Sequence, residues 1–350
     1  MKSSLLLFAA ILPLKGLAET ADSTIAQHHT LEEVVVRGFK QDNLSRAPLS
    51  VSVAGSTFLQ RNELNGLRDM SSVFPNLFIA DYGARQNTPI YIRGIGSKTN
   101  APSVGLYVDG MPYFERSVVD MDIAGISGIE VLRGPQGTLY GRNSTGGLIN
   151  LYTYSPLDYQ NTMAKISYGS RNDLRLGVNH YQKISSCVGI NVAANYHHND
   201  GFFRNLYTGE KADNLQSANT KVGLAWQATP LWTMRLSALF DHSTQGGYPY
   251  GLYHATDNTA DAVNYNRPGY YRRNLFTAGM NWLYKGNAVH FNSQTSVQLS
   301  KDKQQIDQDF TPRDLFFTIT GLKQTLVSQE FTLRSATDNS RYHWMVGAFG

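Results

Sequence analysis

The chain has 350 residues, 31 Lys and Arg against 27 Asp and Glu, and a single cysteine, Cys187. Charged residues make up 17% of it, below the roughly 25% of ordinary soluble domains, and the mean hydropathy is −0.31. No apolar run is longer than residues 5–12, which excludes a polytopic helical membrane protein. A formal charge of +4 without a block of Lys and Arg excludes nucleic-acid binding, and one cysteine excludes a disulfide framework.

The first 18 residues have the three parts of an export signal. Lys2 precedes the apolar residues 5–12, and the small residues Gly16 and Ala18 stand at the cleavage positions. We expect cleavage after Ala18. Residues 19–42 follow as a polar periplasmic tail that holds one short β-branched run, residues 31–38.

Residues 43–155 form a compact segment of mixed α/β texture. Helical patterns cover residues 56–64, with Ser56 as the expected N-cap, and residues 66–73. Glycines separate most of the expected elements. Short strands are expected at residues 50–54, 89–93, 105–108, 129–132 and 147–152.

From about residue 161 onward, apolar and polar residues alternate over long segments. Trp232, Leu236 and Phe240, for example, alternate with polar or small residues. Period two over ten or more residues, with a polar opposite face, predicts an all-β antiparallel transmembrane β-barrel. The alternative is a soluble all-β protein with long hairpins. Short turns are expected at residues 185–186, 229–230, 286–287 and 337–340, and long external loops at 199–216, 243–271 and 303–320.

Residues 156–350 contain about ten such segments, including a weak one at 304–310. Ten strands close a barrel too narrow to hold a folded segment of about 110 residues, whereas plugged transporters have 22. The chain also ends within a strand pattern at Gly350. We therefore expect the N-terminal half of a longer protein. A truncated product that does not transport is the alternative.

Four strings in the compact segment resemble the plug domain of TonB-dependent outer-membrane receptors. They read IRGIG from Ile92, YVDGMP from Tyr107, IEVLRGPQGTLYG from Ile129 and NSTGGLIN from Asn143. The resemblance implies a 22-stranded barrel in the cell outer membrane, filled by the plug, that imports an iron chelate such as a siderophore. The matching motif residues are Arg93, Gly94, Gly96, Asp109, Gly110, Glu130, Arg133, Gly134, Gly137, Gly141, Gly146 and Gly147.

Most of these glycines are expected to mark tight turns that maintain the fold. The charged residues of the segment are available to pair with charges on the inner face of the barrel. Such a polar interface suits a plug that shifts reversibly, because charged contacts exchange with water at low net cost. The charged residues are Arg93, Asp109, Glu115, Arg116, Arg133 and Arg142.

Residues 31–38, which read LEEVVVRG, look like the TonB box of this family. A mobile strand of this kind binds by completing the edge of a partner sheet, so TonB is the expected partner. An ordinary first strand of the plug is the alternative. Arg37 departs mildly from the family pattern. The residues expected to bind TonB are Glu32, Glu33, Val34, Val35 and Val36.

The second long external stretch is rich in tyrosine and arginine, which suits stacking and charge-assisted hydrogen bonds to an iron chelate. The alternative for a single tyrosine is a place in the aromatic girdle of the barrel. Haem, cobalamin, an oligosaccharide, or a surface adhesion role remain open. The candidate ligand-contacting residues are Tyr248, Tyr250, Arg267, Tyr270, Tyr271 and Arg272.

The histidine pairs at 28–29 and 197–198 lack a carboxylate at ligand spacing, so no metal site and no cofactor are expected. No Ser-His-Asp or paired-carboxylate pattern offers catalytic residues, so the chain is not expected to be an enzyme. A monomer surrounded by outer-membrane lipid is expected, because a closed barrel leaves no strand edge to pair.

Overall fold

The computed structural model describes residues 50–85, 88–97, 102–114, 125–336 and 342–350. The expected signal peptide, the periplasmic tail and the TonB-box residues Glu32, Glu33, Val34, Val35 and Val36 lie outside the described residues. Glu115 and Arg116 and the expected turn at 337–340 also lie outside them. All described residues fall in one compact unit, residues 34–350.

The described part of residues 50–155, called the plug here, is built on two small sheets. The larger sheet has the order β1-β7-β8-β5-β6, in which only β5 and β8 pair in parallel. Its strands are β1 (Ser50–Gly55), β5 (Val104–Val108), β6 (Met111–Tyr113), β7 (Ile126–Arg133) and β8 (Gly147–Thr153). The smaller sheet joins β2 (Leu77–Ile79), β3 (Ile90–Ile92) and β4 (Ile95–Gly96).

One apolar core holds the plug together. Leu67, Met70, Ile92, Val131 and Ile149 are each at most 1% exposed and belong to a single cluster. Burying such side chains stabilises the fold by about 1.5–3 kcal/mol each. The three helical turns around this core are α1 (Ser56–Arg61), the 3₁₀ turn η2 (Arg68–Ser72) and α2 (Gly137–Tyr140).

The five strands predicted for the plug are all present, with ends shifted by at most three residues. The first predicted helix stops at Arg61, and the second is a 3₁₀ turn. Ser56 does not cap α1, because the N-cap position is Gly55, which has no side chain that could accept a capping hydrogen bond. The sequence reading missed α2 and the strands β2, β4 and β6, which have only two to four residues each.

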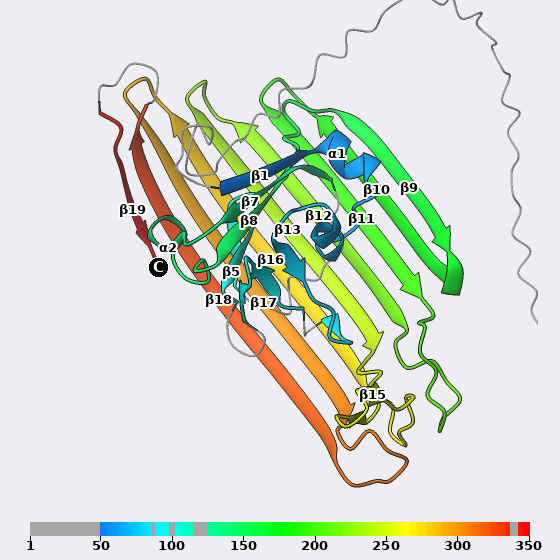
Figure 1. The fold of residues 1–350 in the computed structure, drawn as a ribbon. Helices are drawn as coiled ribbons and strands as arrows, with labels where there is room; N and C mark the ends of the chain where they lie inside the picture. Colours follow the sequence, from blue (N-terminus) through cyan, green and yellow to red (C-terminus); the bar gives the residue numbers. More distant parts are fainter. Residues whose placement is uncertain (1–49, 86–87, 98–101, 115–124, 337–341) are drawn as a thin grey trace, which may run out of the picture. The chain divides into compact units, whose positions relative to one another are not determined.

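The rest of the described chain forms a nine-stranded antiparallel sheet, called the wall sheet here (Figure 1). Neighbouring strands follow the chain order, from β9 at one edge to β19 at the other. The prediction of a separate strand at residues 304–310 is wrong. β17 continues to Asp307, and Asp307 pairs with Phe317 of β18. The strands are β9 (Asn161–Gly169), β10 (Asp173–Lys183), β11 (Val188–Asn199), β12 (Leu215–Gln227), β13 (Trp232–Gly246), β16 (Tyr270–Lys285), β17 (Val289–Asp307), β18 (Phe317–Ser335) and β19 (Met345–Phe349).

Most connections of the wall sheet alternate in length as predicted, but residues 170–172, which join β9 to β10 at the long-loop end, form a short turn. Residues 184–187, 228–231 and 286–288 are short turns at one end of the sheet, and residues 200–214, 247–269 and 308–316 are long loops at the other. The loop at 247–269 contains a two-stranded hairpin, β14 (Tyr253–His254) with β15 (Thr259–Ala260).

The two faces of the wall sheet are opposite in character. Phe240 and Phe276, paired across β13 and β16, are 50% and 40% exposed. The next residues on the other face, Asp241 and Thr277, are buried against the plug side. We call the apolar face outward and the polar face inward. An exposed apolar face with a covered polar face fits a barrel wall in lipid, which confirms the predicted fold class.

Aromatic side chains gather on the outward face beside the short turns. Ring centroids lie 6.2 Å apart for Trp226 and Trp282, 6.1 Å for Trp232 and Trp282, and 5.0 Å for Trp232 and Tyr284. Phe291 continues the group at 6.4 Å from Trp232. Such a girdle is typical of the boundary between hydrocarbon and headgroups. Among the described residues, no helix is both long and apolar enough to span a membrane.

Candidate functional site

The plug touches the long-loop end of the wall sheet through one loop, residues 81–85. The Tyr250 hydroxyl donates a hydrogen bond to the carbonyl oxygen of Tyr82. The backbone N–H of Tyr248 donates to the carbonyl oxygen of Gly83 at 3.0 Å. Two predicted ligand-contacting tyrosines therefore hold the tip of the plug directly.

The same plug loop has further anchors on both sides. The backbone N–H of Arg85 donates to Gln245 Oε1 of β13 at 2.9 Å. Asp81 forms an ion pair with Arg68 of the plug. Gly83 has a φ of +79°, and a Cβ there would lie 3.1 Å from Pro249. The loop is thus shaped to the wall, and a side chain at position 83 would displace it.

A small apolar cluster lies beneath this contact. Ala84, Tyr248 and Tyr271 are buried together, with Tyr250 and Ile306 packed against them. Burial, helped by the carboxylate of Asp81, raises the pKa of Tyr250, so its hydroxyl stays a donor at neutral pH. The cluster couples the loop at 247–269 to the plug tip by packing as well as by hydrogen bonds.

Buried polar groups of the inward face support the cluster. The Tyr248 hydroxyl donates to Gln304 Oε1 at 2.5 Å, and the Tyr271 hydroxyl donates to the Asp302 carboxylate. Arg273 and Asp241 form a fully buried ion pair with an N···O distance of 2.8 Å. Hydrogen bonds to the wall sheet therefore hold the rings of Tyr248 and Tyr271 in place beneath the loop at 247–269, the region called the mouth here.

A cavity of about 270 Å³ opens between the two long loops beside this contact. Asn205, Glu210, Lys211 and Tyr265 are among the residues that line it. Burial raises the pKa of Tyr265 to about 12, so its phenol is neutral. The mixed donors and acceptors can hold a polar ligand group of modest size.

The six predicted ligand-contacting residues separate into two groups in space. Tyr248, Tyr250 and Tyr271 come together at the plug tip. Arg267 lies in the loop, 3.4 Å from Asp314 and with its guanidinium 4.9 Å from the centre of the Phe317 ring. Tyr270 and Arg272 instead stand on the outward face of β16, where the guanidinium lies 4.6 Å from the ring centre. The alternation of β16 turns Arg272 away from the plug tip, whereas Tyr270 also lines the cavity of about 270 Å³ between the long loops.

A second contact joins the plug to the middle of the wall sheet. Lys221 of β12 reaches Asp109 at 2.6 Å and Thr153 at 3.2 Å. Burial alone raises the pKa of Asp109, but the charge of Lys221 and hydrogen bonds from Lys221 and Thr153 outweigh it, and the pKa is lowered. Asp109 therefore stays ionised and paired. Lys221 was missed in the sequence, although it is a cation at an inward position of the alternating β12 pattern.

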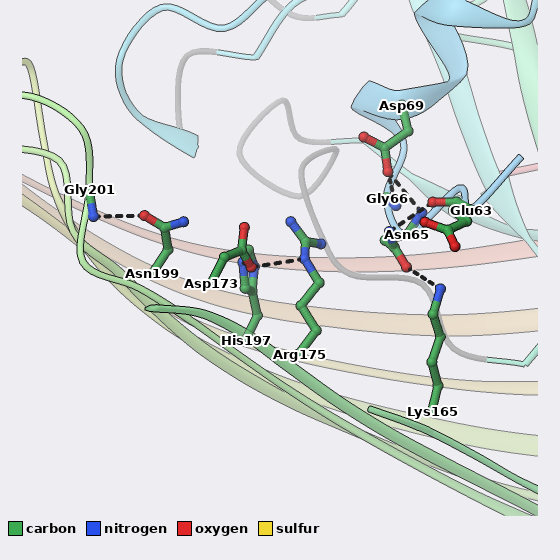
Figure 2. A network of polar contacts seen from close by, with 10 residues as sticks. All are labelled: Glu63, Asn65, Gly66, Asp69, Lys165, Asp173, Arg175, His197, Asn199 and Gly201. Atoms are coloured by element: carbon green, nitrogen blue, oxygen red, sulfur yellow. Dashed lines mark hydrogen bonds and ion pairs between the residues drawn. The ribbon is translucent and has the colours of Figure 1, made fainter. Parts of the chain in front are cut away.

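A polar network lies between the plug and β9 to β11 (Figure 2). Lys165 Nζ donates to Asn65 Oδ1 at 2.8 Å, which links β9 to the plug. On the neighbouring strands Asp173 accepts from Arg175 at 3.2 Å and from His197 at 3.0 Å. Lys165, Asn65, Arg175 and His197 also line a cavity of about 400 Å³. The plug and this part of the wall are therefore separated by a cavity with a mixed lining, to which Leu59 and Met70 of the plug also contribute.

The other charged motif residues act within the plug. Glu130 accepts hydrogen bonds from the Tyr152 hydroxyl at 2.7 Å and from Asn150 at 3.3 Å. Burial raises the pKa of Glu130, an effect these bonds only reduce. Arg133 donates to Ser52 at 2.6 Å and to the Pro75 carbonyl oxygen at 3.0 Å.

Arg142 and Arg93 were also predicted to pair with charges of the wall, and neither forms an ion pair with a described carboxylate of the wall sheet. Arg142 lies over the Phe114 ring at 4.4 Å from its centre. Arg93 is exposed and has a φ of +52°. Among the described charged residues predicted to pair with the wall, Asp109 alone has a recorded ion pair there.

Two motif glycines are required by their surroundings. A Cβ at Gly147, which has a φ of +144°, would lie 2.3 Å from the Leu132 carbonyl oxygen. A Cβ at Gly96 would lie 2.6 Å from the Ile90 carbonyl oxygen. Gly137, by contrast, has open space around its Cβ position.

Within the described residues no group of three His, Cys, Asp or Glu side chains could hold a metal ion.

Comparisons with known proteins agree with this architecture. The family described as TonB-dependent Receptor Plug Domain matches residues 43–148. The pesticin receptor of Yersinia pestis is 35% identical over 130 residues, which are 35% of this chain and 19% of that protein.

Solved structures share the fold. The ferric yersiniabactin uptake receptor of Yersinia pestis aligns with a TM-score of 0.75 and 22% identity, over 86% of this chain and 48% of that one. The pyoverdine outer-membrane receptor of Pseudomonas aeruginosa aligns with a TM-score of 0.68 and 17% identity, over 87% of this chain and 46% of that one. The chain therefore spans about half the length of these structures.

Proposed function

Because residues 43–148 are a TonB-dependent receptor plug domain, we propose that the chain acts in the cell outer membrane as part of a receptor that binds an iron chelate and imports it. The plug is the gate of this receptor, and energy reaches it through TonB. The contact between the plug tip and the loop at 247–269 carries the proposal.

The contact at the tip gives binding a route to the gate. A chelate held by the external loops meets Tyr250, whose hydroxyl holds Tyr82 of the plug. The buried Tyr248 beside it holds Gly83 through its backbone N–H. Any ligand that competes for these groups changes the contacts of the plug tip. Binding of the chelate at the external loops and the conformation of the plug are thus thermodynamically coupled.

The chemistry of the mouth favours a chelate with aromatic or anionic groups. Tyr250, which is only partly buried, offers an aromatic face, and Arg267 offers a guanidinium for charge-assisted hydrogen bonds. The Tyr248 ring is buried beside Tyr250 and supports it. Two of the similar structures are a ferric yersiniabactin uptake receptor and a pyoverdine receptor, so we propose an iron chelate rather than haem, cobalamin or an oligosaccharide. Arg272 is not part of the proposed chelate site, because it stands on the outward face of β16, whereas Tyr270 lines the cavity between the long loops.

The interface around the plug suits a body that moves. Asp109 and Lys221 form its buried charged contact, and a cavity of about 400 Å³ lies between the plug and β9 to β11. Polar contacts exchange with water at low net cost, so a pull can release them. The apolar core lies mostly within the plug around Met70 and Ile149, and Leu275 of β16 is its one buried member from the described wall.

The pull enters through residues 31–38. Glu32, Glu33, Val34, Val35 and Val36 add as a strand to the edge of a TonB sheet, with backbone hydrogen bonds as the grip. Replacing Val35 by Pro removes one ladder donor and stops uptake, while binding of the chelate at the mouth stays intact.

The test measures both steps in cells that produce the receptor. Binding and uptake of an iron-labelled chelate are followed in Val35→Pro and, as a matched control, in Val35→Thr, which keeps the backbone N–H. Uptake that survives Val35→Pro overturns the TonB mechanism. Binding with no uptake in the unmodified chain favours the adhesion role instead. A chain that is absent from outer membranes favours the truncated, non-transporting product.

A further inference from the structure

The outward face of the wall sheet changes from apolar to cationic near the long loops. Phe240, Phe276 and Leu299 stand opposite one another on β13, β16 and β17 and form one apolar row. Two residues nearer the long loops, Lys301 stands opposite Lys323 of β18. All five side chains are exposed.

The next outward row toward the loops adds two more cations. Arg272 of β16 stands opposite Lys303 of β17, and both side chains are exposed. The Tyr270 ring lies 4.6 Å from the Arg272 guanidinium and 5.8 Å from the Lys303 ammonium. Four cations thus occupy two successive rows on three adjacent strands.

These cations have no anionic counterpart on the described wall. The other outward positions of the two rows are His242, Asn274, Thr244 and Gly321. Like charges directly opposite across strands, such as Lys301 and Lys323, destabilise a sheet. The carboxylate of Asp302 points to the opposite face, where it accepts from Tyr271. The charge of these two rows is therefore suited to binding an anion from outside the protein.

An apolar depression lies on the same face, nearer the short turns. It measures about 470 Å³, and its lining includes Val222, Leu236, Ala238, Ala278 and Val297. It exists because Ala238 and Ala278 face each other where neighbouring rows carry larger side chains.

The depression opens on the outward side of the sheet. The inward position between its lining residues on β16 is Gly279, and the inward side there is filled by Met111 of the plug. A Cβ on Gly279 would lie 1.9 Å from the Met111 sulfur. The Met111 sulfur also accepts a hydrogen bond from the Ser237 hydroxyl at 3.6 Å.

We propose that the outward face of β13, β16, β17 and β18 is a binding site for a phosphorylated lipid of the outer leaflet. Its headgroup phosphates lie among Arg272, Lys301, Lys303 and Lys323, and one acyl chain fills the depression at Ala238 and Ala278. Long loops mark the external side of such a barrel, so the cations stand at the level of outer-leaflet headgroups. The proposal rests on the outer-membrane location in the proposed function, and it is independent of transport.

The test uses the full chain purified in a neutral detergent, with bisphosphorylated lipid A as the probe. Native mass spectrometry against lipid concentration gives the dissociation constant. The double variant Lys301→Gln with Lys303→Gln is expected to bind about 30-fold more weakly. The control, Lys183→Gln with Lys285→Gln, removes the same charge beside the short turns and leaves binding unchanged. Equal weakening in both double variants overturns the site.

Three further arms separate the parts of the proposal. Ala238→Phe fills the depression and is expected to weaken lipid A binding, and unchanged binding overturns the acyl-chain position. Dephosphorylated lipid A is expected to bind weakly, and equal binding overturns the phosphate contact. Millimolar inorganic phosphate is expected not to displace the lipid, and displacement overturns the choice of a lipid over free phosphate. Failure of chelate uptake changes none of these readings, because they use purified chain.

Discussion

The plug sheet and the wall sheet are both β-structure, yet their strands have opposite burial patterns. All five residues of β5 and the last five of β7 are buried, whereas β12 and β16 alternate between covered and exposed positions. The plug strands are covered on both faces by the plug itself and by the wall, so successive residues are buried, including the charged Glu130 and Arg133 of β7. The wall strands meet lipid on one face and the plug on the other. A burial pattern thus reports the two media that a strand separates.

The largest expected difference between the two sheets is in their response to truncation of an apolar side chain. Ile149→Ala removes a fully buried side chain of β8 and is expected to cost about 2–5 kcal/mol of unfolding free energy, because a cavity is left. The control, Leu299→Ala, lies on the outward face, and a smaller loss is expected because lipid fills the space. Denaturant unfolding in detergent measures both, and equal losses would contradict the comparison.

Glycine substitutions probe the plug sheet more finely. Gly147→Ala is expected to cost about 1–3 kcal/mol, because its φ of +144° disfavours a side chain and the new Cβ meets the Leu132 carbonyl oxygen. Gly137→Ala lies at the start of α2 in open space and is expected to be neutral or slightly stabilising. Thermal unfolding of both variants gives the answer, and an unaffected Gly147→Ala would refute the argument.

The ion pair across the interface tests how the two sheets are joined. Asp109→Asn leaves Lys221 buried without its charge partner and is expected to weaken the contact by about 1.5–3 kcal/mol. The control, Asp261→Asn, breaks the exposed pair with His254 and is expected to have no measurable effect. Hydrogen exchange of the plug in detergent reports the loosening.

The pH dependence of this contact follows from the lowered pKa of Asp109. Its contribution is fully present above the ordinary value of 3.8 and is lost as the pH falls through the lower pKa of the folded protein. Acid exchange experiments should therefore show loosening only below about pH 4. Loosening between pH 5 and 7 would point to another group.

Substitution of Glu130 is expected to change stability least, and in the opposite direction to substitution of Asp109. Burial raises its pKa above 4.5, so ionisation at neutral pH opposes folding. Glu130→Gln keeps a carbonyl acceptor for Tyr152 and is expected to raise the melting temperature slightly at pH 7 but not below pH 4.5. A lower melting temperature at pH 7 would show that the charge is needed.

The sequence predicted the wall sheet and most plug strands because their signals are local. Alternation along β13 and β16 reads directly from side-chain chemistry, and the turn glycines mark the plug strands. The weak segment at 304–310 was misread because a long loop begins inside it, and only the pairing of Asp307 with Phe317 shows that β17 continues. Pairing partners of this kind lie outside any local window.

The candidate site was predictable in composition but not in arrangement. Tyr248, Tyr250 and Tyr271 are predictable from their chemistry. The hydrogen bonds from Tyr250 to Tyr82 and from Tyr248 to Gly83, however, join residues more than 160 positions apart. Tyr270 and Arg272 show the limit on the other side. Strand parity from Tyr271 places them outward, but the predicted loop runs to residue 271 and covers the true start of β16 at Tyr270. Lys221 needed the fold, because its partner Asp109 is 112 positions away.

The aromatic girdle beside the short turns also has a spectroscopic consequence. All four tryptophans of the chain lie beyond residue 225, and Trp226, Trp232 and Trp282 share that one girdle. Intrinsic tryptophan emission therefore reports insertion of the wall into lipid and carries no signal from a chromophore on the plug. A single tryptophan placed at Phe78, an exposed plug residue, would make plug displacement visible against this background.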